Sequence, residues 1–201
     1  MTEMVEGIRV SEINFEKEPY IWESPIRDLL VISRPYYPDQ RGSFQEDSRD
    51  LDIEAIIGRP LHFVQRSTSE MDPGTVKGIH CERQDKFLQP ILGEYFFVEV
   101  DLRPDSPTFK KWVSFRISAK MKARRNFIFV PNGVGNSMAI LGKKIALLKY
   151  ETSSIYNPEE AKRVVRYDDP DLAIPWPVES PIISNRDLRG FSLQDFLAVY
   201  K

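Results

Sequence analysis

The sequence of 201 residues predicts a mainly β protein, a sandwich or barrel of short strands. Strand-like segments recur along most of the chain, turn signals separate them, and long helical patterns do not alternate with them. The 15 prolines and 10 glycines supply residues that favour such turns. A chain of this length can bury one substantial core, so we expect a single domain over residues 1–201.

The predicted strands are rich in aromatic and β-branched residues or alternate between apolar and polar positions. Turns are predicted between them, for example at Asp72-Pro73-Gly74 and Pro131-Asn132-Gly133. The segments read as strands are 63–69, 75–80, 94–103, 112–118, 126–131 and 145–150.

Two short peripheral helices are predicted. The first covers 51–57, with Asp50 or Asp52 as its cap and Gly58 at its end. The second begins after Ser192, which we expect to be its N-cap. The polar, proline-rich segment 157–181 is expected to be an ordered loop against the barrel, because Trp176 needs burial.

Composition excludes several classes of protein. The formal net charge of −2 gives no overall basic field for nucleic acid, although local cations can still bind a small anion. The single Cys81 cannot form an intrachain disulfide. The N-terminus lacks the pattern of a signal peptide, and no apolar run approaches the ~20 residues that span a membrane. We therefore expect a soluble, cytoplasmic protein without membrane or nucleic-acid partners.

Only two histidines are present, His62 and His80. His62 lies beside Phe63 and is read as structural or surface. His80 ends a predicted strand, and the mouths of barrels are frequent ligand sites, yet a lone histidine is more often structural. A catalytic metal needs clustered histidines and carboxylates, and this chain lacks them, so no metal and no cofactor are expected. Cys81 should point to the opposite face of the strand from His80.

Eight sequence blocks, in order and in register from Arg41 to Asp187, resemble the dTDP-4-dehydrorhamnose 3,5-epimerases. The resemblance implies a cupin jelly roll (a double-stranded β-helix) and a homodimer. It also implies a metal-free isomerase of deoxysugar biosynthesis that acts on a nucleotide-diphosphate 4-keto-6-deoxy sugar. The blocks are RGSFQED at 41–47, FVQRSTS at 63–69, GTVKGIH at 74–80, VDLRPDSPTF at 100–109, FVPNG at 129–133, YETSSIYNPE at 150–159, YDDPDLAIPWP at 167–177 and ISNRD at 183–187.

Carried over residue by residue, the resemblance implies that His80 is the catalytic base and Asp187 its carboxylate partner. Lys86 falls at the lysine near the keto group, after a loop shorter than usual. The position of the catalytic tyrosine depends on the direction of counting. Counted backward from Asn157-Pro158 it falls on Tyr150, and counted forward from Leu141 it falls on Lys149. We choose Tyr150, because a turn absorbs an extra residue whereas a slip along a strand reverses every side chain.

These residue types suit proton transfer at the carbons beside a ketone. Imidazole titrates near neutral pH and can remove the acidified protons. Asp187 would fix the tautomer of His80, and Lys86 would stabilise the enolate oxygen by its charge. Inversion also needs a proton from the opposite face, and Tyr150 is the candidate acid.

The resemblance also implies a substrate-binding set. Arg41 and Lys77 match positions near the diphosphate, and Tyr156 matches an aromatic that stacks on the base. Lys77 stands where arginine is common, so it offers a point charge without a bidentate fork. The other positions near nucleotide or sugar are Phe44, Glu46, Gln65, Ser67 and Asn136.

Besides Lys77, two of these positions depart from the family pattern. Asn136 replaces a frequent histidine, and Ser67 replaces a frequent asparagine. The alternatives left open are a 3-only or 5-only epimerase, an epimerase of another nucleotide-linked 4-keto sugar, a non-catalytic sugar-nucleotide-binding cupin, and a metal-dependent cupin oxygenase.

Overall fold

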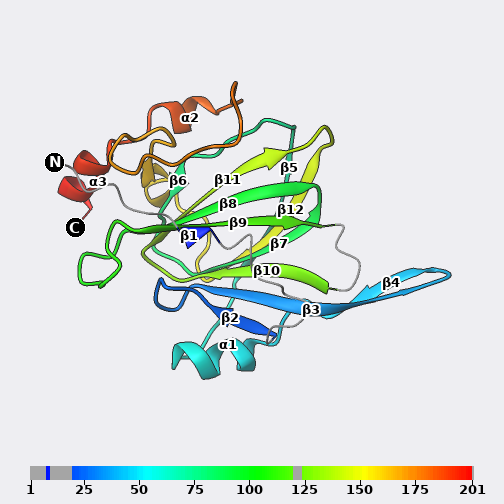
Figure 1. Cartoon of the computed structure of the whole chain (residues 1–201). Coiled ribbons are helices and arrows are strands. Elements are labelled where there is room, and N and C mark those ends of the chain that lie inside the picture. Colours follow the sequence, from blue (N-terminus) through cyan, green and yellow to red (C-terminus); the bar gives the residue numbers. More distant parts are fainter. Residues whose placement is uncertain (1–7, 10–19, 120–123, 201) are drawn as a thin grey trace.

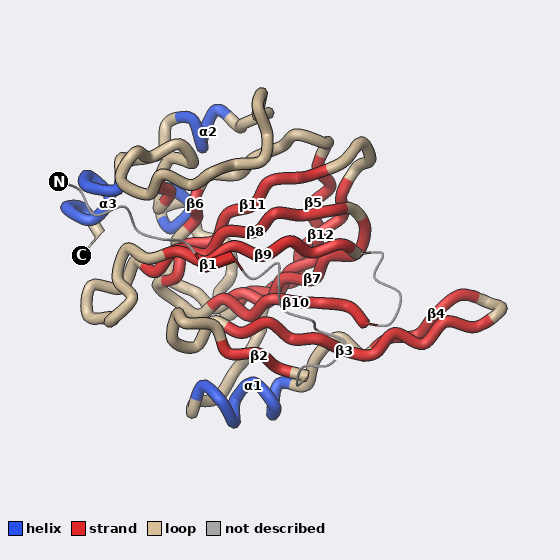
Figure 2. Tube along the Cα trace, in the orientation of Figure 1, coloured by secondary structure: helices blue, strands red, loops and turns tan. Residues whose placement is uncertain are grey.

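The computed structural model describes residues 8–9, 20–119 and 124–200, which form two facing β-sheets with short helices at the periphery (Figures 1 and 2). The prediction of a mainly β jelly roll is confirmed. The strands of the described residues pair antiparallel with one another, except that β1 runs parallel to β9, and two isolated bridges outside these strand pairs are also parallel.

The first sheet has six strands among the described residues, in the order β1-β9-β8-β11-β6-β13. The strands β9, β8 and β11 are long, whereas β6 and β13 at one edge of the sheet are short. Their bounds in sheet order are β1 Ile8–Arg9, β9 Trp112–Ser118, β8 Glu94–Asp101, β11 Val134–Leu141, β6 Ile79–His80 and β13 Val164–Val165.

The second sheet has seven described strands, in the order β2-β3-β10-β7-β12-β5, with β4 paired to the far end of β3. The hairpin of β3 and β4 extends away from the sandwich (Figure 1). The bounds in sheet order are β2 Ile21–Glu23, β3 Leu30–Asp39, β10 Arg124–Val130, β7 Lys86–Leu92, β12 Ala146–Thr152 and β5 Gln65–Met71, with β4 at Gly42–Gln45.

Three apolar clusters explain why many strands are buried on both faces. The interior cluster joins the sheets, for example Phe97 of β8 and Leu88 of β7. A second cluster covers the outer face of the six-stranded sheet with the C-terminal segments, including Phe196. A third places Ile53 of α1 over Phe129 on the seven-stranded sheet. Such double burial produces near-continuous apolar runs in place of strict alternation.

The two predicted helices form, with one difference in capping. Helix α1 spans Asp50–Ile57 and ends at Gly58 in a left-handed conformation. Its N-cap is Arg49 without a side-chain cap, so the prediction that Asp50 or Asp52 caps it was wrong. Asp52 instead receives a hydrogen bond from Arg34 of β3. Helix α3 spans Leu193–Val199, and Ser192 caps it as predicted by accepting from the Asp195 amide.

The predicted strand 75–80 is much shorter than expected. Only Ile79–His80 form a strand, β6, while Thr75 and Val76 make isolated bridges. The pairing is interrupted because the Gly78 amide donates to the side chain of Asp187, 3.0 Å away, rather than to a neighbouring strand. His62 likewise precedes β5 rather than lying in it, and its side chain is exposed.

Residues 157–181 lie against the six-stranded sheet, as predicted, with a 3-10 helix η2 at Glu160–Lys162 and the strand β13. Trp176 is half-buried, and its ring meets Phe96 edge-on at 5.9 Å between centroids. Among the described residues no helix is long and apolar enough to cross a membrane. The expectation about a signal peptide concerns residues 1–7 and 10–19, which lie outside the described residues.

Candidate active site

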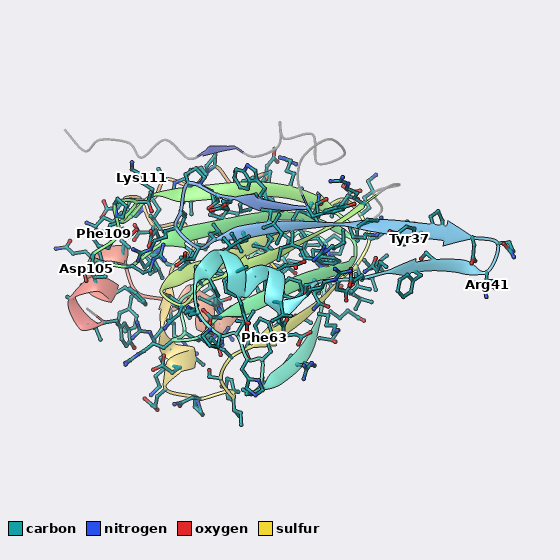
Figure 3. All side chains as sticks on the ribbon, turned by 90° about the horizontal axis from the view of Figure 1, so that it is seen from below. Tyr37, Arg41, Phe63, Asp105, Phe109 and Lys111 are labelled. Atoms are coloured by element: carbon teal, nitrogen blue, oxygen red, sulfur yellow. The ribbon has the colours of Figure 1, made fainter. Side chains whose placement is uncertain are left out.

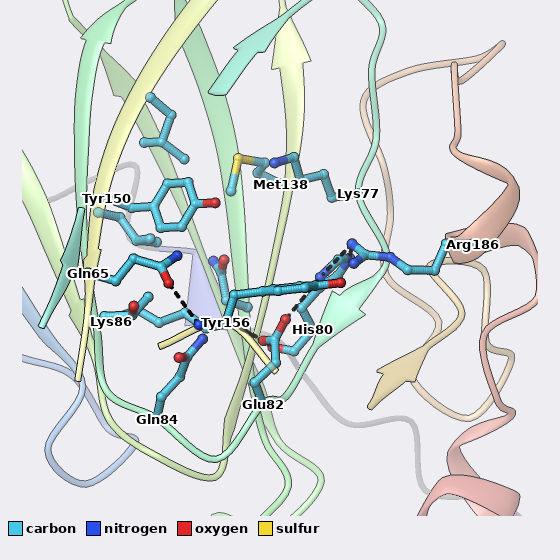
Figure 4. Close-up of a pocket in the computed structure, with 14 residues that line it drawn as sticks. Gln65, Lys77, His80, Glu82, Gln84, Lys86, Met138, Tyr150, Tyr156 and Arg186 are labelled. Atoms are coloured by element: carbon cyan, nitrogen blue, oxygen red, sulfur yellow. Dashed lines mark hydrogen bonds and ion pairs between the residues drawn. The ribbon is translucent and has the colours of Figure 1, made fainter. Parts of the chain in front are cut away.

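A cavity of about 150 Å³ lies between the two sheets (Figure 4). One wall comes from the six-stranded sheet and includes His80 and Asn136. The facing wall comes from β7 and β12 and includes Lys86 and Tyr150. The sandwich therefore brings into one cavity side chains that lie far apart in the sequence.

His80 and Asp187 form a buried pair. His80 Nε2 lies 2.9 Å from Asp187 Oδ1, although the two residues are 107 positions apart. The other oxygen, Oδ2, accepts from the Gly78 amide. Burial alone would raise the pKa of Asp187, but the hydrogen bond and charge of His80 and the Gly78 amide hold that pKa below its usual range. The carboxylate is thus ionised and oriented toward the imidazole.

Local sequence explains how Asp187 reaches His80. Asp187 lies in α2, Asn185–Leu188, whose N-cap Ser184 accepts from the Asp187 amide. A Cβ atom at Gly78 would stand 2.6 Å from Val164, closer than side chains in proteins approach, and 3.2 Å from the Asp187 carboxyl group, which is a tight contact. Glycine at position 78 therefore permits the close approach that the pair requires.

Lys86 is paired with Glu82, and both side chains line the cavity. Its Nζ lies 2.6 Å from Glu82 Oε2 and 3.2 Å from the carbonyl oxygen of His80. Glu82 Oε1 lies 3.5 Å from His80 Nδ1. Burial would raise the pKa of Glu82, but the charge of Lys86 and the contact with His80 lower it well below its usual range. Glu82 is therefore an anion between the predicted base and the predicted enolate-stabilising lysine.

Arg186 and Glu82 both line the cavity, and sequence reasoning missed both. The Nη2 atom of Arg186 lies 3.1 Å from both ring nitrogens of His80, and its Nε lies 3.3 Å from Asp187 Oδ1. Because guanidinium only donates, it can bond to an imidazole nitrogen only through a lone pair. Two signals pointed to these residues: Glu82 stands two positions after His80, and Arg186 directly precedes Asp187.

Tyr150, rather than Lys149, faces the cavity (Figure 4). Side chains alternate along β12, so Leu148, Tyr150 and Thr152 line the cavity. Lys149 points away and lies 3.8 Å from Glu151 in an ion pair. The geometry thus selects the alternative that the turn argument favoured.

Most of the predicted substrate-binding residues on the sandwich gather around this cavity. The Tyr156 amide donates to Gln65 Oε1 at 2.7 Å, which holds the exposed Tyr156 ring at the cavity mouth. Gln65 in turn donates to Ser67 on the same strand. Lys77 lines the cavity, and burial lowers its pKa. Asn136 lies beside His80 in the strand register.

Ser67 is not among the residues that line the cavity, and neither are three further predicted substrate-binding residues. Arg41, Phe44 and Glu46 lie on or beside the projecting hairpin (Figure 3 shows Arg41 at its tip). Arg41 pairs with Asp39, and Phe44 is 68% exposed while it stacks on Tyr37. The single chain therefore leaves these residues apart from His80.

Among the described residues, no group of three or more histidine, cysteine or carboxylate side chains could hold a metal ion. Cys81 is buried in the outer cluster, on the opposite face from His80 as alternation predicted. Burial raises the pKa of its thiol to about 11. Cys81 thus lacks the exposure and acidity of a reactive cysteine.

Comparison with known proteins agrees with this geometry. The family model described as dTDP-4-dehydrorhamnose 3,5-epimerase matches residues 23–195. The dTDP-4-dehydrorhamnose 3,5-epimerase of Pseudomonas aeruginosa is 33% identical over 174 residues, which cover 85% of this chain and 93% of that one. The dTDP-4-dehydrorhamnose 3-epimerase of Streptomyces niveus is also 33% identical, over 81% of this chain and 78% of its own.

A solved relative extends the comparison to three dimensions. It is the dTDP-6-deoxy-D-glucose-3,5-epimerase of Legionella pneumophila Philadelphia 1 in complex with dTDP-4-keto-L-rhamnose. Its structure superimposes with a TM-score of 0.79 at 31% identity, over 87% of this chain and 92% of that one. Sequence and structure together show that the chain belongs to the dTDP-4-dehydrorhamnose 3,5-epimerase family.

Proposed function

We propose that this chain is a dTDP-4-dehydrorhamnose 3,5-epimerase, an isomerase that inverts C3 and C5 of a dTDP-linked 4-keto-6-deoxy sugar. The observation that carries the proposal is the His80–Asp187 pair in a cavity whose opposite wall presents Tyr150. This arrangement provides a base and an acid on two sides of a bound ring. Family membership supports the substrate class.

The reaction begins at a carbon beside the C4 ketone. His80 takes the proton, and the C–H electron pair moves into the ring to form an enolate whose negative oxygen was the ketone. Ionised Asp187 accepts the Nε2 hydrogen of His80 and stabilises the imidazolium that forms. A charged partner of this kind orients the ring before the substrate arrives.

Inversion requires a proton on the opposite face of the same carbon. Tyr150 donates its phenolic proton there, which restores the ketone and leaves a tyrosinate. Solvent then reprotonates Tyr150 and removes the proton that His80 took. Lys86 stabilises the enolate oxygen by charge. Glu82 offsets that charge, because its carboxylate lies 2.6 Å from Lys86 Nζ.

The nucleotide would extend from the sugar cavity toward its mouth. Tyr156 at the mouth offers an exposed aromatic face for the base, and half-buried Lys77 offers a cation for the diphosphate. The solved relative from Legionella pneumophila holds a dTDP-linked keto sugar, which supports the same ligand class here.

We infer that the working form is a homodimer. Arg41 and Phe44 match nucleotide-binding positions, yet they lie on a hairpin that projects from their own sandwich. Insertion of this hairpin beside a second copy's cavity would supply both residues. Light scattering at assay concentration tests the mass of the assembly.

We also propose that the reaction takes place in the cytoplasm, which the buried free thiol of Cys81 supports.

A 3-only epimerase is the second candidate. The Streptomyces niveus relative bears that name, and Asn136 departs from the family pattern beside the base. A non-catalytic sugar-nucleotide-binding cupin is less well supported, since binding alone needs neither a base nor an opposed acid.

Solvent exchange separates these candidates. The chain is incubated with dTDP-4-keto-6-deoxyglucose in heavy water, and each carbon is followed by NMR. Label at both C3 and C5 is expected, and label at C3 alone would identify the 3-only enzyme. Exchange at neither carbon, with the sugar nucleotide bound, would overturn the proposal in favour of a binding module.

A further inference from the structure

Glu99 lies beneath the cavity in a row that begins at the predicted base. In the register of the six-stranded sheet, Asn136 of β11 stands opposite His80 of β6 on one side and Glu99 of β8 on the other. Side chains directly opposite in antiparallel strands lie within about 4.5–5.5 Å at Cβ. His80, Asn136 and Glu99 therefore form a continuous row, and its first two members line the cavity.

Glu99 is fully buried and makes a single hydrogen bond among the described residues. Glu99 is 0% exposed and points to the same face of β8 as Tyr95 and Phe97. Its Oε1 accepts a 2.8 Å hydrogen bond from Asn136 Nδ2. Its Oε2 has no hydrogen-bond partner, and no ion pair reaches Glu99, within the part of the chain that the structure describes.

Such a carboxyl group is held in its neutral form. An ionised carboxylate without a charge partner is strongly disfavoured away from water. Burial accordingly raises the pKa of Glu99 well above its usual range, although Asn136 and the charge of Lys86 oppose the shift. Glu99 thus contributes a hydrogen-bond acceptor under the cavity without adding a negative charge beside His80.

The contact fixes what Asn136 can offer a ligand. An unrestrained asparagine can turn its amide and present either its NH₂ group or its carbonyl oxygen. Here one hydrogen of the NH₂ group is directed to Glu99, which fixes the orientation of the amide and leaves Oδ1 available to accept a hydrogen bond in the cavity. An amide oxygen accepts hydrogen bonds and therefore selects a donor, such as a hydroxyl group of the sugar ring.

We propose that Glu99 is a positioning residue that orients the Asn136 amide so that Asn136 recognises a hydroxyl group of the sugar beside His80. The proposal rests on the proposed function, since it needs a sugar in this cavity. It makes Asn136 a determinant of sugar specificity and assigns Glu99 no contact with substrate.

The test separates sugar recognition from nucleotide binding. Affinities for dTDP-glucose and for dTDP are measured by calorimetry on the full chain and its variants. Glu99→Met removes the acceptor while it keeps an apolar side chain of similar size. Glu99→Gln keeps a neutral side chain with an oxygen in place. We expect Glu99→Met to weaken dTDP-glucose binding about tenfold, the scale of one hydrogen bond, with dTDP binding unchanged. Glu99→Gln should stay within about twofold of the parent chain.

A double-mutant cycle tests the route of the effect. Because Glu99 acts through Asn136, Glu99→Met combined with Asn136→Ala should weaken dTDP-glucose binding no more than Asn136→Ala alone. The control, Phe97→Leu, alters the same buried face two residues away. It should lower thermal stability without changing the ratio of the two affinities.

Three outcomes would overturn the proposal: unchanged dTDP-glucose affinity in Glu99→Met, equal loss of dTDP affinity, or additive effects in the cycle. Failure of the proposed function looks different, because the parent chain would then exchange no label into the keto sugar whatever the Glu99 variants do.

Discussion

Replacing Asp187 by asparagine tests the centre of the site. Asp187 uses one oxygen for His80 and the other for the Gly78 amide, at 2.9 and 3.0 Å. Asparagine has one carbonyl oxygen and one NH₂ group, so it cannot accept from both partners. Either His80 loses its acceptor or the buried Gly78 amide faces another donor.

The size of the effect follows from these two contacts. A hydrogen bond to an ionised group contributes about 1.5–3 kcal/mol, which corresponds to about 10- to 150-fold in rate. We therefore expect Asp187→Asn to lower kcat by at least about tenfold. If the amide of Gly78 loses its acceptor, the unfolding free energy falls by about 1–3 kcal/mol, or about 2–12 °C in Tm for a chain of this size.

The pH dependence of stability supplies a second readout. The pKa of Asp187 is lower in the folded state than its ordinary value of 3.8. Its ionised form therefore stabilises the fold above about pH 4, and this contribution fades as pH falls through the folded-state pKa. The stability difference between the parent chain and Asp187→Asn should be full at pH 7 and should shrink in strong acid.

The assay combines turnover, solvent deuterium exchange and thermal melting. Asp168→Asn is the matched control, because Asp168 is a partly exposed aspartate paired with Arg166 at 2.6 Å. It should leave kcat unchanged. An Asp187→Asn chain that keeps kcat within twofold of the parent chain would refute the assignment of Asp187 as the partner of His80.

Three further substitutions probe the same cavity. Tyr150→Phe should lower net inversion at least about tenfold, while label still exchanges with retention, because removal of the proton does not need the phenol. An equal loss of exchange would contradict the role of Tyr150 as the opposed acid. Gly78→Ala should lower both Tm and kcat, since its Cβ would stand 3.2 Å from the Asp187 carboxyl group, and an unchanged Tm would show that the backbone adjusts freely. Glu82→Gln should tighten dTDP binding at least about twofold in calorimetry, because it removes an anion beside Lys86, and the gain should shrink as salt is added. Weaker binding at every salt concentration would contradict this electrostatic reasoning.

Sequence reasoning predicted the strands well where composition alone determines them. Segments such as 94–103 and 112–118 carry enough aromatic and β-branched residues to identify β8 and β9. It failed at 75–80, where the Gly78 amide bonds to a side chain from a distant helix. The cap of α1 was also missed, because Asp52 is drawn to Arg34 of β3. Tertiary contacts overrode local preference in both places.

The site shows the same division. A turn absorbs an extra residue more easily than a strand, and this was sufficient to choose Tyr150, the residue that lines the cavity, over Lys149. Arg186 and Glu82 stand close in the sequence to predicted catalytic residues, which was a signal for both. The contacts themselves, Arg186 with His80 and Glu82 with Lys86, depend on where the loops lie. The resemblance supplied residue types and positions, whereas the charge balance of the cavity required coordinates.

The separation of His80 and Asp187 along the chain has a consequence for folding and inactivation. The pair is a contact of very high sequence separation, formed only when α2 closes over β6. Long-range contacts form late, and proteins open in cooperative local units well below global unfolding. Mild denaturant should therefore release the C-terminal segments and abolish catalysis while the interior between the two sheets keeps its amide protection. The chain would then keep its folded β-sandwich without activity. It would regain activity when the C-terminal segments dock again, without refolding of the sandwich.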